Sequence, residues 1–254
     1  MPAPRVAARE AASRELAREV LALVAERAQA GRLCVLGLAT GATPRALYAE
    51  LVRAHDAGGP DLAHVVTVNL DEYLGLAEGD ERGFRAEMRA RLHGPLGIPP
   101  ERAWFPPSRG EGADLARRCA EFEGRLAALG GVDLQLLGIG RNGHLAFNEP
   151  GAPLDGRTRE VLLQEVTRAD AAARFGELER VPRGAVTLGL ATILEARALR
   201  VLAFGAAKRE VVARALTGPL DTAVPASALR LHTDCRVWLD AEAAGELLSS
   251  APRP

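Results

Sequence analysis

The chain has 254 residues, 48% of them hydrophobic, and a mixed α/β protein of this length is often a single domain, here predicted over residues 1–254. Its 32 lysines and arginines nearly balance 33 aspartates and glutamates, so no global field would draw it to nucleic acid or to an anionic membrane. The longest apolar runs have only the length of a strand, which argues against a membrane span. Any anionic ligand must therefore be held by local groups.

The N-terminal 32 residues carry charges of both signs and lack an unbroken apolar stretch. This pattern argues against a signal peptide and predicts an amphipathic helix. Three cysteines, Cys34, Cys119 and Cys235, have no CxxC spacing, and an odd number suits a reducing compartment better than a disulfide framework. We therefore expect a cytoplasmic protein whose cysteines are small core residues.

Short apolar runs alternate with helical periods along the rest of the chain. The predicted strands span 33–38, 65–70, 132–140, 200–205 and 236–240, and predicted helices span 43–55 and 207–216. Near-continuous apolar strands separated by helices indicate a parallel sheet covered on both faces. The predicted fold is an open, doubly wound, mostly parallel α/β sheet of Rossmann-like type. In such sheets, ligands lie beyond the carboxyl ends of the strands.

The loop ATGATP follows the first predicted strand and contains Thr40, Gly41, Ala42 and Thr43, with Pro44 at the predicted first helical turn. Small residues let backbone NH groups approach a ligand, and a helix N-terminus adds partial positive charge, so a phosphate cradle is one interpretation. A turn with a threonine N-cap and no ligand is an equally good one. The loop is neither GxGxxG nor a Walker sequence, which disfavours a dinucleotide or ATP.

The second predicted strand runs into NLDEYLGL, where Asp71 stands at the end of the strand. A lone aspartate there would be read as the cap of a turn, with Glu72 in solvent. A carboxylate at this edge of a sheet can instead act as a general base if it faces a substrate carbon or hydroxyl.

The third predicted strand continues into LLGIGRNGHLAFNEPG, residues 136–151. Its glycines permit a sharp change of direction, and His144 and Glu149 form a titratable pair with Asn142 nearby. A lone histidine beside a sheet is more often structural, but the polar residues around this one favour a functional site. The spacing is not HExxH and no second histidine lies close in sequence, so we expect no metal site.

The segments TGATP, VNLDEYLGL, LLGIGRNGHLAFNEPG and GAAK together resemble the ordered motifs of the glucosamine-6-phosphate deaminase family, from about Leu33 to Asp240. The 6-phosphogluconolactonases share the glycine loop and a Gly-His turn but lack FNEP and LDEYLGL, so a lactonase is the enzymatic alternative. A sugar-phosphate sensor is the non-enzymatic one. Such a domain is normally attached to a DNA-binding helix-turn-helix, whereas the N-terminal helix here is alone.

The resemblance implies conversion of glucosamine 6-phosphate to fructose 6-phosphate and ammonia in amino-sugar catabolism. No cofactor is expected, because the proton transfer needs no external electron acceptor. Asp71 would move a proton between C2 and C1 as general base. His144, placed by Glu149 and Asn142, would help to open the sugar ring.

The resemblance also implies a phosphate site made by residues 40–43, Lys208 of GAAK and Arg174. A lysine beside a helix N-terminus costs some repulsion with the helix dipole, which a bound anion would relieve. The polar segment 155–184 is expected to be a mobile lid whose closure brings Arg174 into the site and excludes water.

Several positions depart from the family pattern. Many relatives carry aspartate where this chain has Asn142, so the negative charge that would stabilise an imidazolium is absent. Ala42 replaces a usual glycine, which disfavours a positive φ at that residue. Gly83 and Phe84 stand where relatives typically carry serine and an aromatic residue, so one sugar contact is expected to be missing.

Regulation is a further difference, since some relatives are hexamers activated by N-acetylglucosamine 6-phosphate. This chain keeps Arg159 but has Ala152, Pro153 and Val161 where other effector ligands would stand. An effector without differential affinity for two states cannot shift their equilibrium. We therefore expect hyperbolic kinetics and no activation by that sugar, while the oligomeric state stays open.

Overall fold

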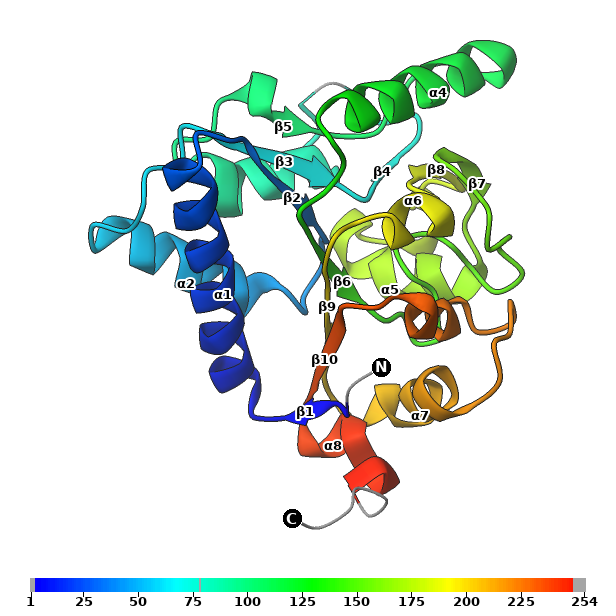
Figure 1. Cartoon of the computed structure of the whole chain (residues 1–254). Coiled ribbons are helices and arrows are strands. Elements are labelled where there is room, and N and C mark those ends of the chain that lie inside the picture. The colour runs from blue at the N-terminus through cyan, green and yellow to red at the C-terminus, as the bar shows by residue number, and fades with distance from the viewer. Residues whose placement is uncertain (1–2, 78, 249–254) are drawn as a thin grey trace.

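The structure, a computed structural model, describes residues 3–77 and 79–248 and contains a seven-stranded parallel sheet (Figure 1). In spatial order its strands are β1 (Arg5–Val6), β10 (Cys235–Leu239), β9 (Leu199–Ala203), β6 (Leu134–Gly138), β2 (Cys34–Leu38), β3 (Val65–Asn69) and β5 (Ala103–Trp104). All five predicted strands are confirmed. The pattern missed β1 and β5, because two-residue edge strands carry no periodic signal.

Helices cover both faces of this sheet, as predicted. They are α1 (Arg9–Gln29), α2 (Arg45–Asp56), α3 (Phe84–Met88), α4 (Gly112–Ala128), α5 (Glu165–Phe175), α6 (Leu190–Leu194), α7 (Arg209–Thr217) and α8 (Ala241–Ala244). The amphipathic N-terminal helix is confirmed as α1. None of the helices in the described part of the chain is long and apolar enough to cross a membrane.

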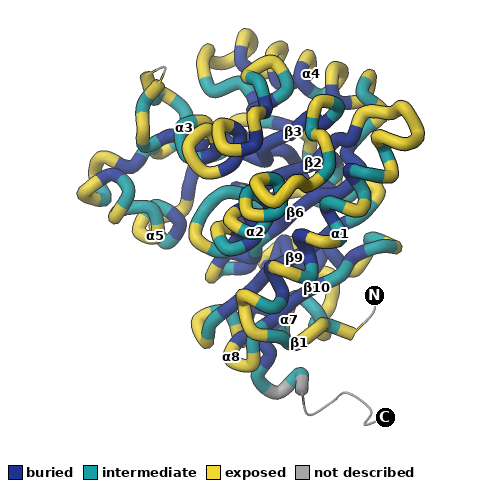
Figure 2. Tube along the Cα trace, turned by 90° about the vertical axis from the view of Figure 1, so that its left-hand side faces the viewer, coloured by how far each residue is buried: buried dark blue, intermediate teal, exposed yellow. Residues whose placement is uncertain are grey.

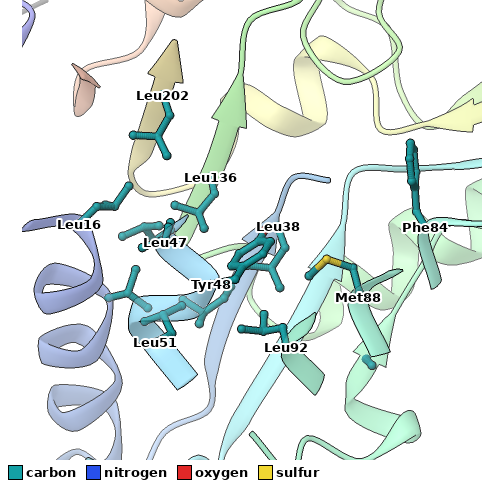
Figure 3. Close-up of a cluster of buried hydrophobic side chains, with 14 of the residues drawn as sticks. Leu16, Leu38, Leu47, Tyr48, Leu51, Phe84, Met88, Leu92, Leu136 and Leu202 are labelled. Carbon is teal, nitrogen blue, oxygen red and sulfur yellow. The ribbon is translucent and has the colours of Figure 1, made fainter. Parts of the chain in front are cut away.

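The core consists of two layers, one on each side of the sheet, because successive strand residues point to opposite faces. Leu36 and Leu38 of β2 join the layer under α1 and α2, whereas Val35 joins the layer under α4, α6 and α7. Figure 3 shows Leu16 of α1 beside Leu47 of α2, in the same buried cluster as Leu38 of β2. The buried strands run through the centre of the trace in Figure 2. All three cysteines are buried, as expected.

A second, antiparallel sheet of three strands was not predicted. Its order is β4 (Asp71–Tyr73), β8 (Gly184–Thr187) and β7 (Arg159–Leu162). Asp71 therefore lies in a strand, paired with Thr187 of β8, and not in a loop after β3. The segment 155–184 is also more structured than a polar loop, because it contains β7, α5 and the buried Phe175.

The chain order locates the ligand crevice. From β2 the chain continues to β3 and β5 on one side, and it later returns to β6, β9 and β10 on the other side. Helices leave the sheet in opposite directions at such a switch point, which opens a crevice beyond the carboxyl ends of the strands. The loops that follow β2 and β6 are the ATGATP and GHLAFNEP segments, so the fold brings these two motifs to one place.

Candidate active site

A cavity of about 1050 Å³ opens at this switch point. Its lining comes from the loops after β2 and β6, from β4 and α3, from α5 and from the start of α7. The predicted site residues that line it are Thr40, Gly41, Ala42, Thr43, Asp71, His144, Arg174 and Lys208. Eight predicted residues from five separate segments therefore meet in one cavity. Asn142 and Glu149 are not among its lining residues, but both contact His144.

The glycine loop has a backbone that fits its sequence. Gly41 has a φ of +95°, a conformation that favours glycine, whereas Ala42 is not among the residues with positive φ. The alanine at position 42 is thus compatible with the turn. Helix α2 begins at Arg45, after Pro44 and without a side-chain cap, so the interpretation of this turn as one with a threonine N-cap is wrong.

Asp71 is a buried carboxylate in the wall of the cavity, with 6% of its surface exposed. Burial raises the pKa of Asp71 to about 8, and the neighbouring Glu72 acts in the same direction while Arg174 opposes them. Charge is disfavoured there because water cannot solvate it. A carboxylate with this pKa can both accept and return a proton near neutral pH.

Glu72 is not in solvent, in contrast to the expectation for a residue at the end of a strand. It is buried, and its carboxylate accepts hydrogen bonds from the backbone NH groups of Tyr73 (2.9 Å), Phe84 (3.0 Å) and Arg85 (2.8 Å). Two of these donors belong to the first turn of α3, where NH groups have no partner within the helix. Glu72 therefore fixes α3, which lines the cavity, against β4.

His144 lies in a tight turn that positions its ring. A Cβ atom at Gly140 would lie 2.2 Å from the imidazole, so only glycine permits this packing. Nδ1 of the ring is 3.6 Å from Glu149 Oε2 and 3.4 Å from Thr167 Oγ1. Burial by itself raises the pKa of Glu149, but hydrogen bonds from His144, Thr167 and Asn142 outweigh it and the pKa is lowered.

Asn142 acts on this pair through Glu149 and not through the imidazole ring. Its Nδ2 donates to Glu149 Oε2 (2.8 Å) and to Gln164 Oε1 (3.1 Å). Its Oδ1 accepts from the backbone NH of His144 at 3.3 Å. The amide thereby holds Glu149 against the histidine and needs no charge of its own to do so.

Arg174 reaches the cavity from the last turn of α5. Its guanidinium pairs with Glu87, donates to the carbonyl oxygen of Arg82 (3.3 Å) and lies 5.1 Å from the ring centre of Phe84. Glu87 also pairs with Arg45 (3.5 Å). Sequence reasoning missed Glu87 and Arg45, because single charges on helices are usually solvated and these two show no motif.

Lys208 is half-buried at the start of α7, beside the glycine loop. Burial lowers the pKa of its ammonium group, which Asp170 opposes and Arg141 reinforces. Lys208 is also the only lysine of the chain, since the other 31 basic residues are arginines. A chain that otherwise uses arginine throughout has lysine at this one position, and this compositional signal can be read from the sequence alone.

Comparison with known proteins agrees with this geometry. The sequence profile of the glucosamine-6-phosphate isomerase/6-phosphogluconolactonase family matches residues 7–238. The chain belongs to this family. It is 40% identical over 231 residues to glucosamine-6-phosphate deaminase of Bacillus velezensis, covering 91% of this chain and 95% of the relative. It is 44% identical over 222 residues to glucosamine-6-phosphate deaminase 1 of Giardia intestinalis, covering 87% and 82%.

Two solved structures differ in their similarity to this chain. A monomeric glucosamine-6-phosphate deaminase matches with a TM-score of 0.89 and 38% identity, over 96% of this chain and 99% of that chain. The 6-phosphogluconolactonase of Trypanosoma brucei matches with a TM-score of 0.75 and 23% identity, over 96% and 98%. The similarity to the lactonase shows a common fold alone.

An aromatic cluster connects the family's motifs in the wall of the cavity. Tyr73 packs against Phe84, Phe147 and Phe175 with ring centres 4.8, 5.4 and 5.2 Å away. These rings come from β4, α3, the GHLAFNEP turn and α5. Phe84 therefore packs with other aromatic rings. The serine hydroxyl that relatives typically carry at the preceding position is absent, because this position is Gly83.

Among the described residues, no group of three or more histidines, cysteines or acids could hold a metal ion.

The contacts of Asn142 predict the effect of the aspartate that many family members carry there. Asn142→Asp would remove an NH donor from Glu149 and place a second carboxylate 2.8 Å from it. Both changes raise the pKa of Glu149, so we expect the acid limb of the activity profile to move to higher pH without loss of turnover. The measurement is kcat/KM between pH 5 and 10. Gln164→Met, which removes the other acceptor without adding charge, is the control, and overlapping profiles of Asn142→Asp and wild type would contradict the assignment.

Proposed function

We propose that this protein is a glucosamine-6-phosphate deaminase that converts glucosamine 6-phosphate and water to fructose 6-phosphate and ammonia. The observation that carries the proposal is the meeting, in one cavity, of the buried Asp71, the paired His144 and Glu149, and the cationic groups of Lys208 and Arg174. The two relatives compared above, 40% and 44% identical, are glucosamine-6-phosphate deaminases, which supports the same conclusion.

Ring opening is assigned to His144. Opening a pyranose requires that the ring oxygen gain a proton and the C1 hydroxyl lose one, which a single imidazole can mediate. Because Nδ1 of His144 faces Glu149 and Thr167, Nε2 is the nitrogen left for the sugar. Glu149 favours the protonated ring after it has accepted the hydroxyl proton, and Asn142 keeps Glu149 in place.

Isomerisation is assigned to Asp71. Its carboxylate takes the proton from C2 of the open-chain sugar and returns it to C1, so that the C1 aldehyde becomes a hydroxymethyl group and C2 becomes an imine. Water then adds to C2, ammonia leaves, and the ketone of fructose 6-phosphate remains. The base must be ionised at the start of this sequence, and its pKa of about 8 implies that kcat/KM rises with pH up to that value.

The phosphate is assigned to the glycine loop, Lys208 and Arg174. Backbone NH groups at Gly41 and beyond, next to the N-terminus of α2, supply donors without net charge. Lys208 supplies a point charge and Arg174 a planar pair of donors. We further propose that residues 155–184 close over the sugar, with the pairing of Arg174 and Glu87 holding the end of α5 at the cavity.

A panel of three phosphorylated sugars tests this function against its alternatives. We expect rapid turnover of glucosamine 6-phosphate, hyperbolic in substrate, and no activation when N-acetylglucosamine 6-phosphate is added. Faster hydrolysis of 6-phosphogluconolactone would identify a lactonase instead. Binding of glucosamine 6-phosphate in calorimetry without any turnover would identify a sensor. A role in cytoplasmic amino-sugar catabolism is part of the proposal.

A further inference from the structure

Helix α5 contacts the active site at both of its ends. Thr167 and Arg174 are two turns apart, which places them on one face of the helix, and both line the cavity. Arg174, in the last turn, is the cation assigned to the substrate phosphate. Just before the first turn, the backbone NH of Gln164 donates to Glu149 Oε1 at 3.2 Å. One helix therefore connects the phosphate site with the pair formed by His144 and Glu149.

The hydroxyl of Thr167 reaches both members of that pair. The residue is buried, with 6% of its surface exposed. Its Oγ1 is 3.4 Å from Nδ1 of His144, closer than the 3.6 Å between Nδ1 and Glu149 Oε2. The same hydroxyl hydrogen-bonds to Glu149, where it counters the effect of burial on the pKa of that carboxyl. Thr167 therefore contacts the ring and the carboxylate at once.

The direction of these two contacts follows from the charge of Glu149. Despite burial, its hydrogen bonds lower the pKa of this carboxyl, so near neutral pH it is ionised and can only accept. A hydroxyl has one hydrogen, and an ionised carboxylate is a stronger acceptor than a neutral imidazole nitrogen. Thr167 therefore donates to Glu149 and turns a lone pair toward Nδ1. That nitrogen matches both of its neighbours only if it carries the hydrogen of the neutral ring.

The plane of the His144 ring and the position of its hydrogen are set by different residues. A Cβ atom at Gly140 would lie 2.3 Å from Nδ1 and 2.3 Å from Nε2, so the ring lies flat against this glycine. This packing fixes the plane of the ring but does not distinguish its two nitrogens. The choice between the neutral tautomers is made by the groups that face Nδ1, which are Thr167 and Glu149.

We propose that Thr167 is a positioning residue for ring opening, whose hydroxyl holds the neutral His144 as the tautomer with its hydrogen on Nδ1. Nε2 then presents a lone pair to the cavity, takes the proton of the C1 hydroxyl and passes it to the ring oxygen as the bond between C1 and that oxygen breaks. The other tautomer presents an N–H there and cannot accept this proton. The inference rests on the proposed deaminase activity, and Thr167 acts on the reaction through His144.

Thr167→Val tests the hydroxyl, because valine keeps the shape of threonine and removes only the polar group. We expect kcat and kcat/KM for glucosamine 6-phosphate to fall together about tenfold or more, as part of the roughly 10²- to 10⁴-fold that a positioned acid–base group contributes. KM should change little. Calorimetric binding of 2-amino-2-deoxyglucitol 6-phosphate should also be unchanged, because this alcohol has no ring to open. Thr167→Ser keeps the hydroxyl and should restore most of the turnover.

Thr192→Val is the matched control. Thr192 is also buried, and its hydroxyl also donates to a carboxylate, Glu123 Oε1 at 2.6 Å. Neither of these two residues lines the active-site cavity. The control therefore makes the same chemical change in a similar environment and should retain the wild-type kcat.

Nitrogen-15 NMR of the histidine rings reports the tautomer without any substrate. The signals of His144 are those that disappear in a His144→Gln protein, and the spectra are recorded at pH 9, well above the pKa of about 6.5 of an ordinary imidazole. We expect the hydrogen on Nδ1 in the wild type and in Thr167→Ser, and a mixture of both tautomers in Thr167→Val. Because this measurement needs no turnover, its result does not depend on the proposed function.

Three results would overturn the role of Thr167. They are a wild-type kcat in Thr167→Val, an equal loss of kcat in Thr167→Ser or Thr192→Val, and a ring that keeps its hydrogen on Nδ1 in Thr167→Val. If the tautomer changes in Thr167→Val but the wild type does not turn over glucosamine 6-phosphate, the proposed function is wrong and the positioning of the ring by Thr167 stands.

Discussion

Asp71→Asn is expected to lower kcat for glucosamine 6-phosphate by a factor of about 10² to 10⁴, the usual contribution of a general base, with little effect on binding of the sugar phosphate. The substitution keeps the shape of the side chain and removes only the proton acceptor. The matched control is Glu81→Gln, which makes the same chemical change at an exposed position of the same cavity and should retain most turnover. Near-normal kcat in Asp71→Asn would show that another group is the base.

The same variant is expected to be more stable than the wild type. The pKa of Asp71 is about 8 in the folded protein and 3.8 for an ordinary aspartate. Between about pH 4 and 8 the folded protein keeps a proton that the unfolded chain releases, so the stabilisation is present at low pH and is lost as pH rises through that window. Asparagine has no charge to bury. We therefore expect Asp71→Asn to raise Tm more at pH 8 than at pH 5, and an equal Tm at pH 8 would contradict the desolvation of this carboxylate.

Lys208→Ala is expected to raise KM for glucosamine 6-phosphate about 10- to 150-fold, with kcat little changed. The loss of one charge-assisted hydrogen bond costs roughly 1.5 to 3 kcal/mol and is felt equally in substrate and transition state. Lys208→Arg keeps the positive charge and should lose less. Steady-state kinetics of the two variants make the comparison, and an unchanged KM in Lys208→Ala would place the phosphate elsewhere.

The composition of the chain provides an independent check on Lys208. Since it is the only lysine, an amine-directed reagent has this side chain and the N-terminal amine as its targets. Pyridoxal phosphate carries both an aldehyde and a phosphate, and borohydride fixes the imine that it forms with an amine. If Lys208 belongs to a phosphate site, we expect the reagent to label it and inorganic phosphate to prevent that labelling.

The sequence predicted the central sheet because its strands are buried on both faces and therefore read as near-continuous apolar runs, such as residues 34–38 and 201–203. It could not predict the β4–β8–β7 sheet. Strand β4 has three residues and follows β3 after only Leu70, and its partner β8 lies more than a hundred residues further along the chain. No local pattern distinguishes such a strand from a turn.

The site shows the same division. It could be predicted that Asp71 and His144 lie near each other, because both follow strands of the parallel sheet and line the same cavity. The buried position of Glu72 could not, because an acidic residue next to a strand end is usually solvated, and its partners belong to a helix that begins twelve residues later. Glu87 was missed for a similar reason. Its charge is buried by Arg174 of α5, a contact that only the tertiary fold creates.

The most direct test of the central claim is the stoichiometry of products formed from glucosamine 6-phosphate by the pure protein, without added metal, nucleotide or other cofactor. Ammonium and fructose 6-phosphate are measured in the same reaction at pH 8, where Asp71 is about half ionised. Equimolar formation of the two products, at a rate that depends on the protein concentration, is the predicted result. Formation of neither product, or of ammonium without fructose 6-phosphate, would contradict the account.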